Sequence, residues 1–277
     1  MQGEASRLAD RESRDSFAAK LRESGNDAWE IGNELFTITY VFDHNPRIPR
    51  ALTDPGRPTE DKVALLNNLL GKQALPLTME ILTDLVGRSW SRAGDIDNAI
   101  EDFAVDAMMY QADDEKKTLK VSVQLAQLQS ALLNLPVVRS DLSDSQGPLN
   151  VRYELLHALI DGADFDRITV RLAEHCTRNP RNRRYLESVQ WLINKFTRHM
   201  GESMVTVTTA TPLSDEQSDK LARIYTKKTG RPVHIHSVVD PTVMGGMRIQ
   251  VGDEVTDNTV VAQLENLKRK VKAGVSE

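Results

Sequence analysis

The spacing of hydrophobic residues changes once along this chain, near residue 201, and this change constrains the fold more than any other feature. Before it, apolar residues recur about every 3.6 positions between Pro, Gly and Asn breaks, which is typical of amphipathic helices packed into bundles. After it, Met204–Thr209 alternates with a period of two and is rich in β-branched residues, which is typical of a strand. The sequence therefore predicts a mostly α, α+β protein with a small C-terminal α/β module.

The helical region contains two similar halves, related by an offset of 90 residues. The corresponding positions are mostly core or helix-ending residues: Ile31 with Val121, Leu35 with Leu125, Phe42 with Leu132, Pro46 with Pro136, Leu52 with Leu142, Asp54 with Asp144, Pro58 with Pro148 and Leu66 with Leu156. Beyond Arg88 the offset becomes 93, which pairs Ile100 with Ile193. Leucine-rich helices can fall into partial register by chance, but here proline and loop positions match as well. We therefore expect two related helical bundles, residues 1–112 and 113–202.

The remaining residues, 203–277, predict a β-α-β-β-α module. After the first strand, Ser214 and Gln217 have the spacing of a capping box that opens a helix. Gly230 can end that helix in a left-handed conformation.

Two further strands and a helix complete the expected module. Val233–Val239 and Met247–Val251 are the strands, and Gly245-Gly246 is expected to form a tight turn between them. The last helix is expected to begin at Thr256 or Asp257. Val260, Leu264, Leu267 and Val271 would lie on one face of it.

Composition and charge exclude several classes of protein. With 40% hydrophobic and 27% charged residues, the chain is too charged for a membrane protein and too apolar for a disordered one. A formal net charge of -5 without a basic stripe argues against a general nucleic-acid binder. Val121–Val138 is uncharged but keeps its apolar residues on one face, which predicts a core helix rather than a membrane span. The single cysteine, Cys176, suits a reducing compartment, and Met1–Arg22 lacks the apolar region of a signal peptide.

No motif for catalysis, cofactor binding or metal binding stands out. His234 and His236 lie on one face of a predicted strand, but a metal site needs a third ligand, so we favour a polar strand face. His175 and Cys176 are adjacent on a helix and point about 100° apart, so they cannot form a nucleophile and base pair. Cys176 is expected in the core. We expect no catalytic residue, no cofactor and no metal.

The densest basic cluster consists of Arg178, Arg181, Arg183 and Arg184, with Tyr185 beside it. Contact with RNA or a phosphate is one interpretation, and contact with an acidic protein surface is another. Loop arginines of an acidic protein more often pair with nearby carboxylates, and we favour that interpretation over nucleic acid.

The C-terminal residues also carry a resemblance. Two segments, Val205–Ser214 and Gly230-Arg-Pro-Val233, resemble the start of the C-terminal domain of the ATP synthase delta subunit family. This family includes the mitochondrial oligomycin-sensitivity-conferring protein. Val239–Asp253 and the turn after it resemble the signature of that family. The matched residues are Asp240, Pro241, Gly245, Gly246, Gly252, Asp253, Asp257 and Leu264. Asn258-Thr259 stands where Gly-Ser is usual, but Asn tolerates a left-handed turn and Thr keeps a hydroxyl.

The N-terminal helices, with the stop at Pro46 and the stretch Pro58–Leu70, are also similar to the helical domain of this family. The second bundle is a departure, because the usual chain has one. The resemblance then implies that an extra copy is inserted before the C-terminal module.

The resemblance implies a non-catalytic stator (peripheral stalk) subunit of the proton-translocating F-type ATP synthase. Its partners would be the N-terminal segments of the alpha subunits in the catalytic head and the b-type stalk subunit, with no nucleic acid and no direct membrane insertion. It would lie peripherally at the cytoplasmic face of the cell membrane, as part of the complex. Two alternatives stay open: a helical-repeat interaction adaptor unrelated to the synthase, and an enzyme that uses His234, His236 and Asp240.

Overall fold

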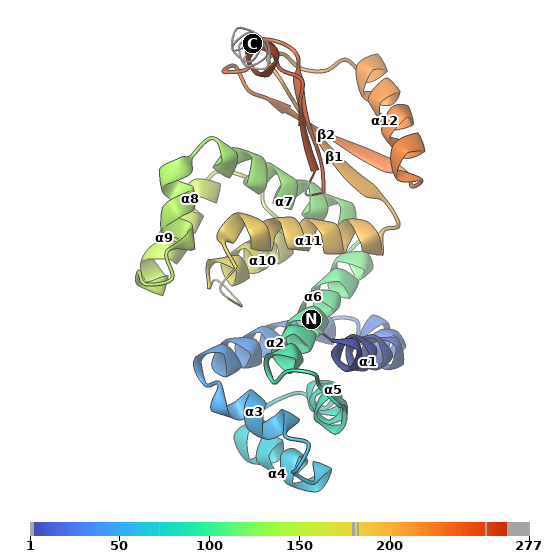
Figure 1. The fold of residues 1–277 in the computed structure, drawn as a ribbon, viewed down its shortest axis with the longest axis vertical. Coiled ribbons are helices and arrows are strands. Elements are labelled where there is room, and N and C mark those ends of the chain that lie inside the picture. The colour runs from blue at the N-terminus through green and yellow to red at the C-terminus, as the bar shows by residue number, and fades with distance from the viewer. Residues whose placement is uncertain (1–2, 72, 179–180, 182, 253, 265–277) are drawn as a thin grey trace, which may run out of the picture. The chain divides into compact units, whose positions relative to one another are not determined.

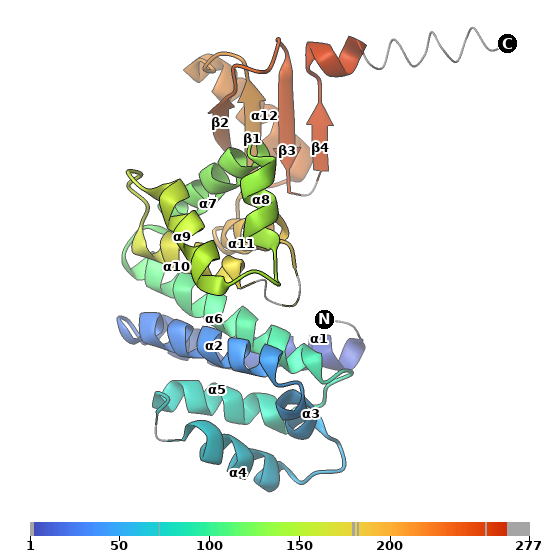
Figure 2. The ribbon, with the colours of Figure 1, turned by 90° about the vertical axis from the view of Figure 1, so that its left-hand side faces the viewer.

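The computed structural model describes residues 3–71, 73–178, 181, 183–252 and 254–264, and it confirms a mostly α, α+β fold (Figures 1 and 2). The chain divides into two compact units. The N-terminal unit comprises residues 1–118 and 170–183, and the C-terminal unit comprises residues 119–169 and 184–277. The chain therefore leaves the N-terminal unit, returns to it for one short segment, and ends in the C-terminal unit.

The N-terminal unit is helical. Its elements are α1 (Glu4–Glu23), α2 (Asp27–His44), α3 (Arg47–Thr53), α4 (Thr59–Leu70), α5 (Pro76–Gly87) and α6 (Gly94–Asp114). As expected, α2 ends just before Pro46, because proline removes a helical hydrogen bond and restricts the residue before it. The bundle boundary expected after residue 112 falls inside α6, whose last residue is Asp114.

The core of this unit is built on α6, which is buried along most of its length. Phe103 of α6 contacts Phe17 of α1 in an edge-to-face arrangement, with ring centroids 6.1 Å apart. Gly32 of α2 lets α2 approach α6 closely, since a Cβ at this position would lie 2.7 Å from Cε of Met108. The absent side chain is thus part of how these two helices pack.

Five helices follow in the same order as α2 to α6. They are α7 (Thr118–Leu133), α8 (Pro136–Ser143), α9 (Leu149–Ile160), α10 (Arg167–Thr177) and α11 (Tyr185–His199). The start of α9 lies 90 residues after the start of α4, and the other starts differ from the expected offsets by one or two residues. This agreement covers the whole repeated stretch.

The two halves also share local geometry. Oδ1 of Asp54 accepts a hydrogen bond from the backbone N–H of Gly56 at 2.9 Å, and Oδ1 of Asp144 accepts one from Gln146 N–H at 2.9 Å. Both turns lead into a helix whose N-cap is proline, α4 or α9. We propose that these paired turns reflect a duplication, because packing alone does not require the same loop in both halves.

The C-terminal module contains β1 (Ser203–Thr209), α12 (Asp215–Thr229), β2 (Val233–Val239), β3 (Met247–Val251) and β4 (Glu254–Asp257). The strand order is β2-β1-β3-β4, as Figure 2 shows. β1 and β2 are parallel, and α12 supplies the crossover that a parallel pair needs. The expected capping box at Ser214 and Gln217 is present, and Gly230 ends α12 with φ 70°.

The core of the module lies between α12 and one face of the sheet. Val205, Val207 and Ile249 from the strands pack with Tyr225 of α12, and Leu221 borders this cluster. These residues alternate along the strands, as a sheet with one face on an apolar core requires.

Two expectations for the strands of the module were wrong. β4 was not predicted; it is short and polar and lies at the sheet edge, so it lacks the apolar alternation that marks a buried strand. Gly245-Gly246 does not join neighbouring strands, because β1 lies between β2 and β3. The module is therefore β-α-β-β-β up to residue 257, followed by helical residues 260–264.

Candidate interaction sites

The Gly-Gly pair of the signature forms a contact between two segments of the module. Gly245 and Gly246 have φ 122° and 78°, values that L side chains rarely adopt. A Cβ at Gly246 would lie 2.4 Å from the carbonyl oxygen of Asn258. On either side of this approach, Asn258 N–H donates to Met247 O at 3.0 Å and Val260 N–H donates to Gly245 O at 3.1 Å. Glycine is needed here so that the backbone after β4 can lie on the loop before β3.

The two signature aspartates stabilise turns. Asp240, followed by Pro241, accepts hydrogen bonds at Oδ1 from the N–H and the hydroxyl of Thr242, at 2.9 and 2.6 Å. Asp257 accepts one at Oδ1 from Thr259 N–H at 2.9 Å. The hydrogen bonds from Thr242 and Thr259 hold the pKa of the two carboxyls below their ordinary value, because they favour the charged form. These residues organise loops of the module.

Gly252 occupies the turn between β3 and β4, where Val251 pairs with Glu254. Its φ is 59°, which suits the two-residue turn of a hairpin. Asp253 lies outside the described residues.

The last helix begins later than expected, and its described apolar side chains at Val260 and Leu264 are exposed. Thr256 and Asp257 lie in β4, and Oγ1 of Thr259 instead accepts from Ala262 N–H at 3.3 Å. Leu264 is 56% exposed and Val260 is half-exposed, so neither is a core residue; Leu267 and Val271 lie outside the described residues.

Several exposed apolar side chains lie close together in sequence, within residues 244–264 of the module. They are Met244, Val255, Val260, Val261 and Leu264, and Met244 is 80% exposed. They come from the loop before β3, from the edge strand β4 and from the residues after it. Apolar side chains at a sheet edge are typical of a surface that a partner covers. Sequence patterning placed Val260 and Leu264 on one face of a helix, because it detects a helical stripe but not what the stripe faces.

Two arginines of the cluster pair with carboxylates, as the sequence interpretation favoured. Arg181 pairs with Asp43, and Arg183 pairs with Glu101. Cys176 is fully buried, and burial raises the pKa of its thiol. A thiol in this state is not a nucleophile.

The structure also shows a buried polar contact that sequence reasoning missed. His175 Nε2 lies 2.8 Å from Oε1 of Glu101, and both residues are almost fully buried. Burial lowers the pKa of His175, so the neutral ring donates its Nε2–H to the carboxylate. The sequence signal that could have indicated burial was the position of Glu101 among mostly apolar residues of a predicted helix.

The two histidines of β2 do not form a metal site within the described part of the chain. His236 is buried and His234 is half-buried, on the sheet face that also carries Thr206. No group of three His, Cys, Asp or Glu side chains that could hold a metal ion occurs among the described residues. Burial, and then the neighbouring His234, lower the pKa of His236 to about 4.

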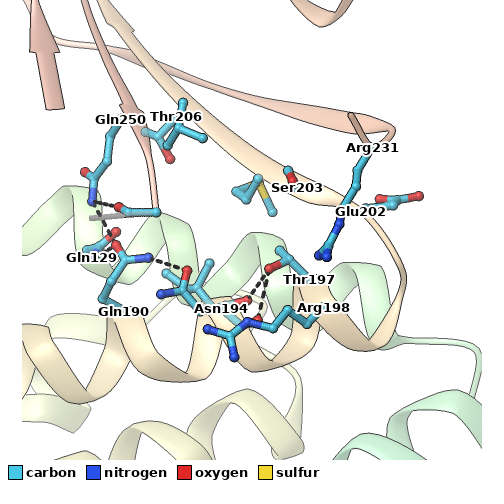
Figure 3. A pocket seen from close by; sticks show the side chains of 14 residues that line it. Gln129, Gln190, Asn194, Thr197, Arg198, Glu202, Ser203, Thr206, Arg231 and Gln250 are labelled. Atoms are coloured by element: carbon cyan, nitrogen blue, oxygen red, sulfur yellow. Dashed lines mark hydrogen bonds between the residues drawn. The ribbon is translucent and has the colours of Figure 1, made fainter. Parts of the chain in front are cut away.

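A polar cavity of about 260 Å³ lies in the C-terminal unit (Figure 3). Gln190 of α11 is at the centre of its amide network: Oε1 accepts from Nε2 of Gln129 and of Gln250, each at 2.8 Å. Gln190 Nε2 donates to Asn194 at 3.0 Å. These neutral amides join α7, α11 and β3 through hydrogen bonds and supply no nucleophile or general base.

Each unit also has a groove between helices. In the N-terminal unit, a groove of about 540 Å³ is lined by residues that include Phe17, Pro76 and Met79. In the C-terminal unit, a groove of about 880 Å³ is lined by residues that include Arg184 and Leu186. A bundle groove of this kind can accept an amphipathic helix from a partner.

Among the described residues, no single helix is both long and apolar enough to cross a membrane. The successive helices α7 and α8 meet the length and composition criteria only when taken together, and they are bent by 112° at the break between them.

The fold and these sites define a class: a mostly helical protein with a C-terminal mixed-sheet module and surfaces suited to binding partner proteins. Residues 104–271 match the family described as ATP synthase delta (OSCP) subunit. The chain belongs to this family.

Similar proteins match over nearly the whole chain. It is 70% identical over 273 residues to the ATP synthase subunit delta of Bifidobacterium adolescentis, covering 99% of both chains. It is 66% identical over 272 residues to that of Bifidobacterium longum (strain DJO10A), covering 98% of both. The similarity to the Streptomyces avermitilis protein of the same name is 30% over 267 residues, with 96% of this chain and 97% of the other covered.

Proposed function

We propose that this chain is a non-catalytic stator subunit of the proton-translocating F-type ATP synthase, linking the catalytic head to the b-type stalk. Membership in the ATP synthase delta (OSCP) subunit family is the observation that carries this proposal. The head must be held still while the rotor turns within it, because otherwise proton flow is not coupled to ATP synthesis. The subunit then works by rigid binding. It would lie peripherally at the cytoplasmic face of the cell membrane, as part of the complex.

The helical bundles supply the proposed contact with the head. An N-terminal helix of the alpha subunit would place its apolar face in a bundle groove. The family match begins at residue 104, inside α6, and includes all of α7 to α11. We therefore propose that the second bundle is the helical domain typical of the family, that α1 to α5 are the added part, and that the alpha segment occupies the groove beside Leu186.

The C-terminal module supplies the proposed contact with the b-type stalk. Its exposed apolar side chains, from Met244 to Leu264, are the surface that a stalk helix would cover. The signature turns at Asp240, Gly246 and Asp257 set the shape of the loops that carry several of these side chains. The proposed role of the signature is therefore structural support for this surface.

Titration calorimetry of the full chain against a peptide of the alpha N-terminal segment tests the head contact. We expect binding with a submicromolar Kd. Leu186→Glu should weaken it at least tenfold, because it replaces an apolar side chain of this groove with a charge, whereas Met79→Glu in the groove of the N-terminal unit is the matched control. The reverse pattern would move the contact to the added bundle, and no binding by the wild-type chain would contradict the proposed head contact.

A further inference from the structure

Residues 170–183 are here called the strap, and of these the structure describes 170–178, 181 and 183. They include most of α10 and belong to the N-terminal unit. The flanking residues on both sides belong to the C-terminal unit. The strap therefore adds to the N-terminal unit a piece of the chain far away in sequence from α1 to α6.

The centre of the strap contact is a buried carboxylate. Glu101 of α6 is 1% exposed, and its Oε1 accepts hydrogen bonds from His175 and Arg183. Both partners are on the strap. Burial alone would raise the pKa of Glu101, but the hydrogen bond from His175 and the charge of Arg183 bring it below its ordinary value, so the carboxylate is ionised.

Aromatic contacts surround this centre. The ring of His175 stacks on Phe36 of α2, with centroids 4.1 Å apart. The guanidinium of Arg171 lies 4.9 Å from the centre of the Phe36 ring, and that of Arg178 lies 4.2 Å from the centre of the Tyr40 ring. Each is a cation–π contact that also covers an apolar face.

The far end of the strap is held by polar contacts. Arg181 pairs with Asp43 at the end of α2, and its Nη2 donates to the backbone carbonyl of Asp97 at 2.9 Å. The described residues of the strap thus contact both α2 and α6.

We propose that the strap completes the fold of the N-terminal unit and that the charge of Glu101 holds it there. Without the strap, Glu101 would be an ionised group next to the core of α6 with neither of these partners, and an uncompensated buried charge is strongly destabilising. The N-terminal unit is therefore not self-sufficient. This inference does not depend on the stator proposal, since its test reads folding and not binding.

The strap carries its own protease sites, so limited trypsin digestion of the folded full-length chain tests the proposal. Cleavage after Arg178 and Arg181, followed by mass spectrometry, reports opening of the strap. Glu101→Gln keeps the shape of the side chain but removes its charge. We expect roughly a hundredfold faster cleavage at these two sites, because a buried ion pair is broken. Cleavage after Arg223 in α12 should not change.

Glu80→Gln is the matched control, because Glu80 pairs with Lys20 on the exposed surface and should leave strap cleavage at the wild-type rate. Arg183→Gln removes the charge from the strap side and should accelerate cleavage after Arg178 at least tenfold. Wild-type cleavage rates in folded Glu101→Gln and Arg183→Gln variants would overturn the proposal.

Hydrogen exchange of the wild-type chain gives a second reading that needs no variant. Amides of α10 within the strap should be as protected as those of α6, since both open together. Exchange of the strap amides much faster than those of α6 would also refute the proposal.

Discussion

The close approach of Gly246 to Asn258 tests whether the signature glycine stabilises the C-terminal module. Gly246→Ala places a methyl group 2.4 Å from the carbonyl oxygen of Asn258, at a residue with φ 78°. Gly230→Ala is the matched control, because Gly230 has φ 70° in the same module and a Cβ there meets no atom within 4 Å. The two substitutions share the cost of the left-handed backbone and differ in the contact.

The expected magnitudes follow from these two terms. The left-handed conformation costs an alanine about 1 kcal/mol, which is the whole effect expected for Gly230→Ala. The contact is with backbone atoms that cannot rotate away, so Gly246→Ala should lose about 2 kcal/mol more, or about 3 kcal/mol in total.

Hydrogen exchange at the Val207 amide, in the centre of β1, measures the opening free energy of the module in both variants. We expect roughly fivefold faster exchange for Gly230→Ala and roughly a hundredfold for Gly246→Ala. Equal losses in the two variants would show that the approach to Asn258 is unimportant and that the reasoning is wrong.

Three further predictions concern the core, the helix cap and pH. Leu52→Ala and Leu142→Ala remove equivalent side chains that are both fully buried, and each should lower the free energy of unfolding in urea by about 2–5 kcal/mol; a loss in only one would contradict the equivalence of the two halves. Ser214→Ala removes the hydroxyl that accepts from Gln217 N–H and should lower the stability of the module by about 1 kcal/mol, which exchange in α12 would detect. The pKa of His236 is about 4 in the folded chain, below its unfolded value of about 6.5. The contribution of neutral His236 to the free energy of unfolding is therefore fully present above pH 6.5 and is lost as the pH drops toward 4. His236→Gln should flatten this part of the profile of unfolding free energy against pH, and an unchanged profile would refute the assignment.

The helices could be predicted from the sequence because their signals are local. The stop at Pro46, the capping box at Ser214 and the left-handed Gly230 each depend on a few neighbouring residues, and each is found as expected. The buried positions of the repeat, such as Leu35 and Leu125, followed from helical spacing.

The missed features depend on contacts distant in sequence. Glu101 and His175 are 74 residues apart, and nothing in the local sequence of either residue identifies the other as its partner. Strand β4 is stabilised by its pairing with β3 and not by its own polar sequence. The face of Leu264 could not be assigned because helical spacing does not tell a core from an exposed apolar surface.

Reconstitution tests the stator proposal most directly. ATP synthase purified without this subunit and placed in vesicles should let protons pass without making ATP at the normal yield. Adding back the full chain should restore proton-driven ATP synthesis, and a chain carrying Leu186→Glu should restore it less well than one carrying Met79→Glu. Full coupling in the absence of the chain, or no recovery when the folded wild-type chain is bound to the complex, would contradict the proposed role.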